Sequence, residues 1–200
     1  MLPLIYTNSI ATGLFLAVCL VWLVPEIASM RRQMARVSRK AHLIQDHGSL
    51  GILLGLQWAG LALNFLLAWL IPAAAILWQR ASLLLLGLTA ILLGVALRWY
   101  AIRVLGSYFS RDVVVMSDQP VVMHGPYRLI RHPAYSGTFL TMLGVGLALT
   151  NWASLLSLLL CVFLGHLYRV SIEEKALIQM IGQPYLAYMQ RTKRFIPWVF

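Results

Sequence analysis

Charged side chains are scarce in this chain of 200 residues: they make up 11% of it, against about 25% in an ordinary soluble domain. Acidic residues are the rarest, at six, while hydrophobic residues reach 60% and the mean hydropathy is +0.79. So few charges exclude a soluble globular domain, whose surface needs them for solubility. The composition therefore predicts an integral membrane protein.

The features of nucleic-acid-binding proteins are also missing. The formal net charge of +10 could suggest such a partner, but binding would require a soluble basic module with groups that read or stack on bases. Here the basic residues lie in short segments between apolar runs. The positive-inside rule for membrane proteins accounts for that placement. No nucleic-acid partner is therefore expected.

Motifs for metals and dinucleotides are absent from the sequence as well. The two cysteines, Cys19 and Cys161, lie in apolar runs and have no Cys-x-x-Cys or Cys/His ligand spacing. No G-x-G-x-x-G follows a strand-like segment, which argues against a Rossmann site. We therefore predict no metal centre and interpret the cysteines as small apolar residues.

What the sequence does contain is five apolar segments, each close to the roughly 20 residues that cross a hydrocarbon core. They cover residues 9–28, 48–71, 81–97, 133–149 and 152–168. No basic residue precedes the first segment, so we interpret it as a retained helix rather than a signal peptide. The segments predict an all-α integral membrane protein with about five transmembrane helices.

The distribution of basic residues predicts the orientation in the membrane. They gather in the segments 31–40, 103–131 and 169–194, while the opposite side has only Arg80. With an odd number of spans, this asymmetry places the N-terminus outside and the C-terminus in the cytoplasm. We expect a multi-pass protein of a bacterial inner membrane, or of the endoplasmic reticulum if the chain is eukaryotic.

Two arginines mark the end of the third apolar segment. Arg98 and Arg103 flank Trp99 and Tyr100, an arrangement typical of interfacial anchors whose cations reach the water beside an aromatic belt. We interpret them as anchors first and as functional residues second.

The last two apolar segments are joined only by Thr150 and Asn151, which predicts a tight helical hairpin. The second helix of that hairpin is expected to continue to Ile181 and to end at Gly182. At 1.5 Å per residue its length is roughly 45 Å, so about a third of it would stand in the cytoplasm. Pro184 is then expected to begin a short terminal helix that folds back over that side.

A polar, proline-containing segment, GPYRLIRHPAYSG, separates the third and fourth apolar runs at residues 125–137. Pro133 is well placed to begin a helix, and the free amides of such a helix start, those of Ala134, Tyr135 and Ser136, attract anions. Further along, Arg169 and Glu173 are four residues apart and share a helix face. Spacing alone leaves them either an ion pair or part of a site.

Three elements together resemble a known family: GPYRLIRHPAYSG, then Arg169-x-x-x-Glu173-Glu174, then Gly182-x-x-Tyr185-x-x-Tyr188. In order and spacing, over about residues 106–197, they are similar to the isoprenylcysteine carboxyl methyltransferase family and its phospholipid methyltransferase relatives. The resemblance implies a cytoplasmic S-adenosylmethionine pocket unrelated to the Rossmann fold. The cofactor contacts that it implies come from Gln119, Val121, Val122, Tyr127, His132, Pro133, Ala134, Tyr135 and Glu173.

The resemblance further implies that Arg169 binds and orients the acceptor. One departure is that residues 119–122, Gln-Pro-Val-Val, stand where the enzyme acting on prenylated proteins has His-Thr-Leu-Val, which puts side-chain contacts there in doubt. We expect residues 1–104 to form a three-helix transmembrane region. Residues 105–200 would then form the methyltransferase core, with its cofactor loop, helical hairpin and terminal cytoplasmic helices.

Several acceptors suit a pocket open to both the cytosol and the lipid. We favour the carboxylate of an isoprenylcysteine-like or isoprenoid acid, either a lipophilic small molecule or a prenylated protein. A phospholipid amine is the alternative, and Glu174 or His132 would then take its proton. Outside this class, a non-catalytic transporter subunit or scaffold and an NADPH-dependent membrane reductase remain open.

Overall fold

The chain folds entirely into helices in the part that the structure describes. The computed structural model describes residues 2–40, 46, 48–113 and 119–197, and for residues 29–40 the backbone alone. The side chains of the predicted basic segment 31–40 therefore lie outside the described part. The α-helices are α1 (Leu4–Thr7), α2 (Ser9–Lys40), α3 (Ser49–Leu70), α4 (Arg80–Leu105), α5 (Pro133–Ala148), α6 (Trp152–Ile181) and α7 (Gln183–Arg191). Short 3-10 turns are η1 (Pro72–Ala74), η2 (Gly106–Tyr108) and η3 (Gly125–Arg128).

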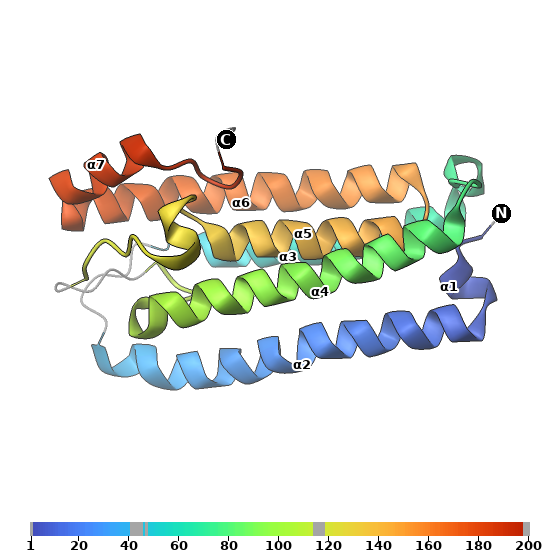
Figure 1. Ribbon diagram of the computed structural model, residues 1–200, viewed down its shortest axis with the longest axis horizontal. Helices are drawn as coiled ribbons and strands as arrows, with labels where there is room; N and C mark the ends of the chain where they lie inside the picture. The colour runs from blue at the N-terminus through green and yellow to red at the C-terminus, as the bar shows by residue number, and fades with distance from the viewer. Residues whose placement is uncertain (1, 41–45, 47, 114–118, 198–200) are drawn as a thin grey trace.

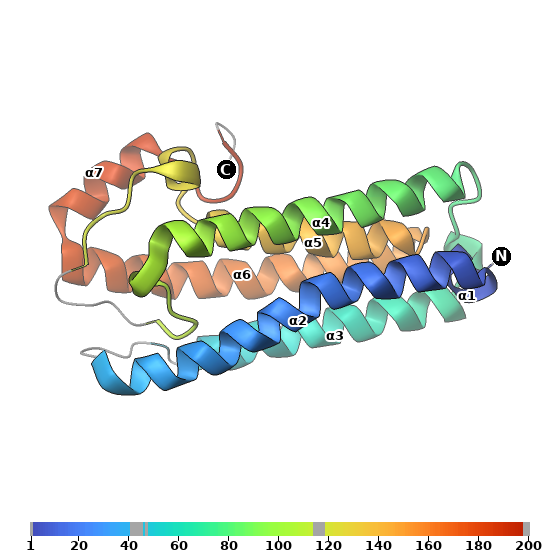
Figure 2. The same cartoon turned by 60° about the horizontal axis from the view of Figure 1, so that its bottom comes forward.

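Helices α2 to α6 run alternately up and down along one long axis (Figure 1 and Figure 2). The N-terminus lies at one end of this bundle, and the ends of α2, α4 and α6 lie at the other with α7 and η3. The all-α membrane fold predicted from the sequence is confirmed. By length and composition, four of the described helices could cross a membrane: α2 over Ser9–Ala28, α3, α4 and α6.

Helix α5 is the exception among the five predicted spans. It has 16 residues and packs between α4 and α6, and most of its residues are buried. Because α5 is packed between other helices, its apolar side chains are buried against protein. The helix therefore does not need to be long enough to cross the whole hydrocarbon layer. Its inner position also brings its first turn against the ends of α4 and α6.

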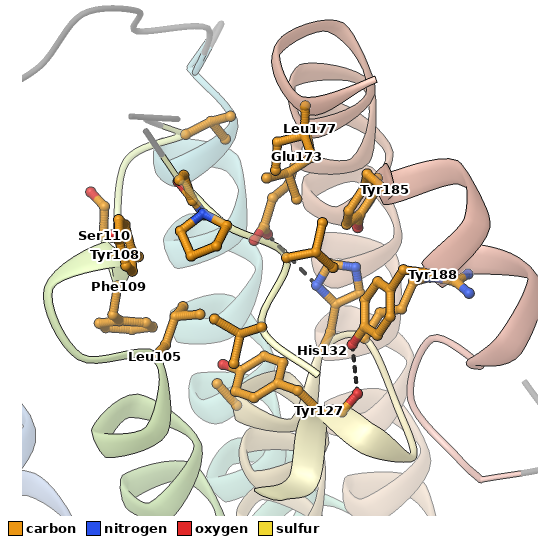
Figure 3. Close-up of a pocket in the computed structure, with 18 of the residues that line it drawn as sticks. Leu105, Tyr108, Phe109, Ser110, Tyr127, His132, Glu173, Leu177, Tyr185 and Tyr188 are labelled. Atoms are coloured by element: carbon orange, nitrogen blue, oxygen red, sulfur yellow. Dashed lines mark hydrogen bonds and ion pairs between the residues drawn. The ribbon is translucent and has the colours of Figure 1, made fainter. Parts of the chain in front are cut away.

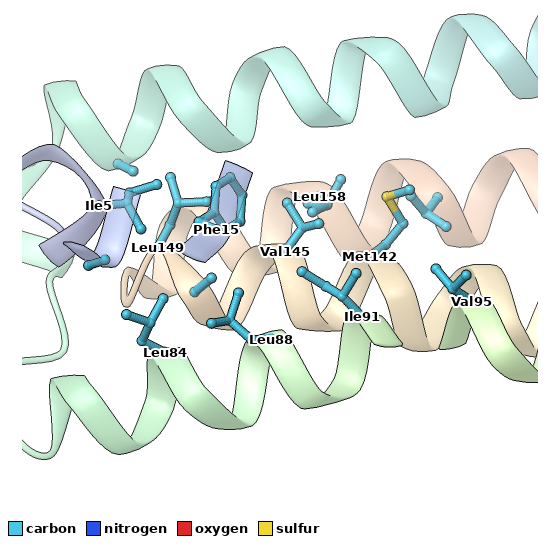
Figure 4. Close-up of a cluster of buried hydrophobic side chains, with 14 residues drawn as sticks. Ile5, Phe15, Leu84, Leu88, Ile91, Val95, Met142, Val145, Leu149 and Leu158 are labelled. Carbon is cyan, nitrogen blue, oxygen red and sulfur yellow. The ribbon is translucent and has the colours of Figure 1, made fainter. Parts of the chain in front are cut away.

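Glycines allow α4 and α5 to pack backbone against backbone. A Cβ at Gly94 would lie 2.5 Å from the Thr141 amide nitrogen, and one at Gly144 would lie 2.4 Å from the Gly87 carbonyl oxygen. Small residues serve the same purpose between membrane helices generally, where close contact replaces the hydrophobic driving force. Beside this contact, Ile91, Met142, Val145 and Leu158 are among the buried side chains of the core (Figure 4).

The turns and helix ends agree with the sequence predictions at the C-terminal side. Thr150 adopts a positive φ of 47°, and the Asn151 side chain caps α6 by accepting from the Ser154 amide at 3.1 Å. Helix α6 ends at Ile181, and Gly182 follows with a φ of 71°. Helix α7 then begins with a proline in its first turn.

Two helices extend beyond the apolar segments that predicted them. Helix α2 passes Pro25 and reaches Lys40 rather than ending near residue 28, and α4 reaches Leu105 rather than residue 97. Hydrophobicity marks where a helix is apolar and not where it stops. Arginine, lysine and methionine are good helix formers, so both helices continue into polar sequence.

The interpretation of Arg98 as an interfacial anchor is wrong. Its Nη2 donates to Glu26 Oε1 on α2 at 2.9 Å, its Nη1 donates to Thr138 Oγ1 on α5 at 3.3 Å, and its side chain is 14% exposed. Snorkelling presumes that water is the nearest partner for the cation. Here a carboxylate 72 residues away in the sequence lies nearer, and spacing along one helix could not reveal it.

We expect Gly94→Ala to destabilise the bundle, because the new methyl group would meet the backbone of α5 and force the two helices apart. Overpacking of this kind costs about 1–3 kcal/mol. Gly55→Ala on α3 is the matched control, because its Cβ would meet nothing within 4 Å and alanine favours a helix over glycine. Unfolding in detergent should show a lower midpoint for the first variant alone. Equal midpoints would mean that the α4–α5 contact is not tight.

Candidate active site at the end of the bundle

A cavity of about 860 Å³, partly open to solvent, lies where α4, α6 and α7 end. Figure 3 shows its walls: Tyr108 and Phe109 follow α4, Glu173 and Leu177 extend from α6, and Tyr185 and Tyr188 come from α7. All the predicted site residues except Pro133 line it, namely Gln119, Val121, Val122, Tyr127, His132, Ala134, Tyr135, Arg169 and Glu173. Pro133 is buried behind them in the first turn of α5.

Glu173 is the carboxylate that faces this cavity. Its Oε2 accepts a hydrogen bond from the Tyr135 hydroxyl at 2.8 Å and lies 3.9 Å from Nδ1 of His132. The side chain is 30% exposed, so one face of the carboxylate remains available to a ligand. A cation that entered the cavity would meet a negative charge whose orientation Tyr135 already fixes.

Arg169 lies on the same face of α6 but pairs with a different carboxylate. Although its side chain is 2% exposed, its Nη1 forms an ion pair with Asp46 and donates to Ser49 Oγ at 2.6 Å. Its Nη2 donates to the carbonyl oxygen of Arg111. The Arg169–Glu173 ion pair that the spacing allowed is replaced by the pair with Asp46, a residue that sequence reasoning assigned no role.

The surroundings of Asp46 keep its carboxylate charged. Burial raises the pKa of Asp46, but hydrogen bonds from the Leu50 amide and the Ser49 hydroxyl, together with the Arg169 charge, outweigh burial, so this pKa lies below its ordinary value. The Leu50 amide lies 3.2 Å from Oδ2, at the start of α3 where amides and the helix dipole favour an anion. Asp46 is thus both a cap of α3 and the counter-ion of Arg169.

Glu174 points away from Glu173 and joins three chain segments. It is 3% exposed; its Oε1 accepts from Arg131 Nε at 2.8 Å and its Oε2 accepts from Arg194 Nη2 at 2.8 Å. His132 Nε2 lies 3.4 Å from the same carboxylate. His132 is therefore held between the two glutamates, which fixes its ring at the edge of the cavity.

The C-terminal segment holds the start of α5 in place. The amides of Arg131 and His132 donate to the carbonyls of Lys193 and Arg194 at 2.7 and 3.0 Å, and Ser136 Oγ donates to the carbonyl of Phe195 at 2.7 Å. This pairing fixes the start of α5, where His132 lines the cavity.

The prediction of free amides at the start of α5 is wrong in part. The amides of Tyr135 and Ser136 both donate to the carbonyl oxygen of His132, at 3.0 and 3.1 Å. The Ser136 bond is the first ordinary i→i−4 bond of the helix, since His132 is its N-cap, and the Tyr135 bond is an i→i−3 bond of a tightened first turn. An anion at this position would have to rely on the remaining amide of Ala134 and on side chains.

Four aromatic side chains that were not among the predicted site residues also line the cavity: Tyr108, Phe109, Tyr185 and Tyr188. The last two were noticed only as part of the family motif. Tyr188 donates its hydroxyl to the Tyr127 carbonyl at 2.7 Å and lies 5.9 Å from the ring of Tyr185. Burial raises the pKa of Tyr188 to about 12, and the charge of Arg131 lowers it by less. Tyr108 and Phe109 follow the end of α4, and neither was named from the sequence.

Sites of other kinds are not supported within the described residues. Among them, no group of three or more histidine, cysteine or acidic side chains is placed to hold a metal ion. The chemistry available at the cavity therefore comes from carboxylates, among them Glu173, from guanidinium groups, among them the buried Arg169, from a histidine and from an aromatic wall.

Known proteins share the sequence of this region. The model of the isoprenylcysteine carboxyl methyltransferase family matches residues 85–179. Protein-S-isoprenylcysteine O-methyltransferase B of Arabidopsis thaliana is 33% identical over 115 residues, which are 56% of this chain and 58% of that protein. The protein-S-isoprenylcysteine O-methyltransferase of Saccharomyces cerevisiae is 32% identical over 116 residues, 57% of this chain and 48% of that protein.

A solved structure shares the fold. The eukaryotic intramembrane Ras methyltransferase ICMT matches with a TM-score of 0.59 and 30% identity, covering 72% of this chain and 51% of that one. This chain spans about half the length of these relatives. Residues 85–179 are thus similar in sequence to the isoprenylcysteine carboxyl methyltransferase family, and the helical fold is similar to that of the solved methyltransferase, in agreement with the resemblance that the motifs indicated.

Proposed function

We propose that this chain is an S-adenosylmethionine-dependent methyltransferase that acts on the carboxylate of a membrane-resident isoprenylcysteine-like or isoprenoid acid. The observation that carries the proposal is the position of Arg169 and Glu173. They lie one helical turn apart on α6 and line the same cavity, at the end of a membrane bundle. Glu173 would bind a cation and Arg169 would bind an anion, so the two binding positions are adjacent.

The residues of the cavity suit the cofactor. Glu173 supplies a negative charge for the cationic groups of S-adenosylmethionine, and Val121, Val122 and Tyr127 supply an apolar wall for its adenine. When bound, the cofactor would supply a methyl group activated by a sulfonium. The residues of the chain would orient the reactants and exclude water, which accounts for most of the rate of such a displacement.

The partners of Glu174 favour a carboxylate acceptor over an amine. An ammonium acceptor must lose a proton before it is methylated, and a general base must be free to take that proton. Glu174 is buried and accepts from Arg131 and Arg194, and two guanidinium groups favour its charged form and occupy its oxygens. A carboxylate acceptor needs no base and matches the charge of Arg169.

The polar residues within the spans give a transporter little support. The mid-span Asn64 is buried, and its Oδ1 accepts from Ser154 Oγ at 2.8 Å. This bond joins α3 to α6, and the side chain is buried between the two helices rather than exposed along a path for a solute. We propose that residues 105–200 form the methyltransferase core and that residues 1–104 hold it in the membrane.

Calorimetry and an acceptor assay test the proposed function directly. Protein purified in detergent should bind S-adenosylhomocysteine and not NADPH. It should then transfer methyl groups to an S-farnesylated N-acetylcysteine and not to phosphatidylethanolamine. Preference for the lipid amine would select the phospholipid alternative, and binding of NADPH alone would select a reductase.

The charge asymmetry of the bundle predicts its topology. Arg80 begins α4 and donates to the carbonyl oxygen of Leu2, near the N-terminus. At the other end, Arg131 lines the cavity, Arg194 pairs with Glu174, and the Arg111 carbonyl accepts from Arg169. The positive-inside rule predicts that the cavity faces the cytoplasm. We propose that the cofactor is made in that compartment and enters the cavity from it. A reporter fused after Phe200 should therefore be cytoplasmic and a tag before Leu2 external, in a bacterial inner membrane by preference. The reverse labelling pattern would contradict the site as well as the topology.

Replacing Glu173 by glutamine should weaken binding of S-adenosylhomocysteine by about 1–3 kcal/mol, the value of a charge-assisted hydrogen bond. Glu174→Gln is the matched control, because it removes the adjacent charge from the bonds to Arg131 and Arg194 rather than from the cavity. The control should lower the unfolding midpoint and the first variant should not. Equal losses of affinity in both variants would mean that neither carboxylate binds the cofactor specifically.

Arg169→Lys should leave binding of S-adenosylhomocysteine nearly intact and strongly lower turnover of the farnesylated acid. Lysine keeps the positive charge but lacks the planar set of donors that orients a carboxylate. Calorimetry and steady-state kinetics on the same preparation separate the two effects. A parallel loss of cofactor affinity would instead make Arg169 part of the cofactor site.

A further inference from the structure

Arg169 is held by residues outside the segment that carries the family match. Asp46 and Ser49 lie at the start of α3, and both bond Nη1 of the guanidinium. The family match begins only at residue 85. The N-terminal region therefore contributes directly to the surroundings of the acceptor-binding arginine.

The other terminal nitrogen is fixed by a second route. Nη2 donates to the backbone carbonyl of Arg111, and the Arg111 side chain forms an ion pair with Glu26 of α2. Glu26 is paired in turn with Arg98 of α4. Two N-terminal helices, α2 and α3, thus set the position of both ends of the guanidinium fork.

Two donors of Arg169 remain, because the bonds to Asp46, Ser49 and the Arg111 carbonyl use three of the five N–H groups of a guanidinium. One of the two is Nε, which is buried and has no hydrogen-bond partner, although the residue lines the cavity. A buried N–H without an acceptor is unfavourable unless a ligand or water supplies one. A carboxylate that replaces none of the existing bonds would therefore be held by Nε and the second N–H of Nη2.

We propose that Asp46 is a positioning residue for the acceptor, holding Arg169 by Nη1 so that Nε and the second N–H of Nη2 are the donors presented to the acceptor carboxylate. This inference rests on the proposed function. It assigns Asp46 a role in acceptor recognition, which neither its place in the sequence nor the family match indicates.

The fixed position of Asp46 favours positioning over competition with the acceptor. Its two oxygens accept from the Ser49 hydroxyl at 2.9 Å and from the Leu50 amide at 3.2 Å, in addition to Arg169. A carboxylate with three partners at a helix start has no reason to leave when a second carboxylate arrives. It remains in place and keeps the guanidinium oriented.

A double-mutant cycle on Asp46→Asn and Arg169→Lys tests this role. Asparagine keeps a good helix cap and removes the charge that holds Nη1. With S-farnesylated N-acetylcysteine as the probe, Asp46→Asn should raise the acceptor KM about tenfold, a coupling typical of residues in contact. Binding of S-adenosylhomocysteine should change less than about twofold. The double variant should be no worse than Arg169→Lys alone, because Asp46 acts through Arg169.

Ser49→Ala is the control variant for changes at the start of α3. It removes a hydroxyl partner of Arg169 and leaves the ion pair with Asp46. Its KM should rise less than that of Asp46→Asn. A lower KM in Asp46→Asn would show that Asp46 competes with the acceptor. Additive effects in the cycle would show that it supports only α3, and either result overturns the inference.

The test separates this inference from the proposed function. If the wild-type protein methylates the farnesylated acid and Asp46→Asn does so with an unchanged KM, the positioning role alone is wrong. If the wild-type protein binds S-adenosylhomocysteine but never methylates the acid, the proposed function is wrong and the inference falls with it.

Discussion

A charge that is buried at the edge of a hydrocarbon layer must have a partner, because an unpaired ion there is strongly unfavourable. This constraint organises the cavity end of the molecule. Glu26 binds two arginines, Glu174 binds two arginines, and Arg169 binds Asp46. Each pair joins segments far apart in the sequence, so the same interactions that neutralise charge also fix the cavity walls.

Of the two adjacent glutamates at this end, Glu173 is left with more freedom. Glu174 is 3% exposed and held by Arg131, Arg194 and His132. Glu173, its neighbour in sequence, has the Tyr135 hydroxyl as a neutral partner and keeps 30% of its side chain exposed. Side chains at adjacent positions on a helix point about 100° apart. Glu174 therefore binds the C-terminal segment, while Glu173 faces the cavity.

Close backbone contact between α4 and α5 has a comparable consequence. Without side chains at Gly87, Gly94, Gly137 and Gly144, these helices approach until their backbones touch. The short α5 can then sit inside the bundle, and its first turn, with His132 and Tyr135, reaches the cavity from within. The glycines thus act on the site by placing the helix that carries it.

The sequence alone determined the helical class, the membrane environment, the hairpin at Thr150, the end of α6 and the start of α7. These follow from local rules: the length of apolar runs and the turn chemistry of glycine and proline. The family resemblance added nine of the residues that line the cavity. The sequence did not determine that α2 continues to Lys40, that Tyr135 and Ser136 bond to the His132 carbonyl, or that Arg98 pairs with Glu26. Only the tertiary structure decided which carboxylate neutralises Arg169. The partner is 123 residues away, and an ion pair at that separation is chosen by helix packing, which brings the start of α3 beside α6, and not by any pattern within one helix.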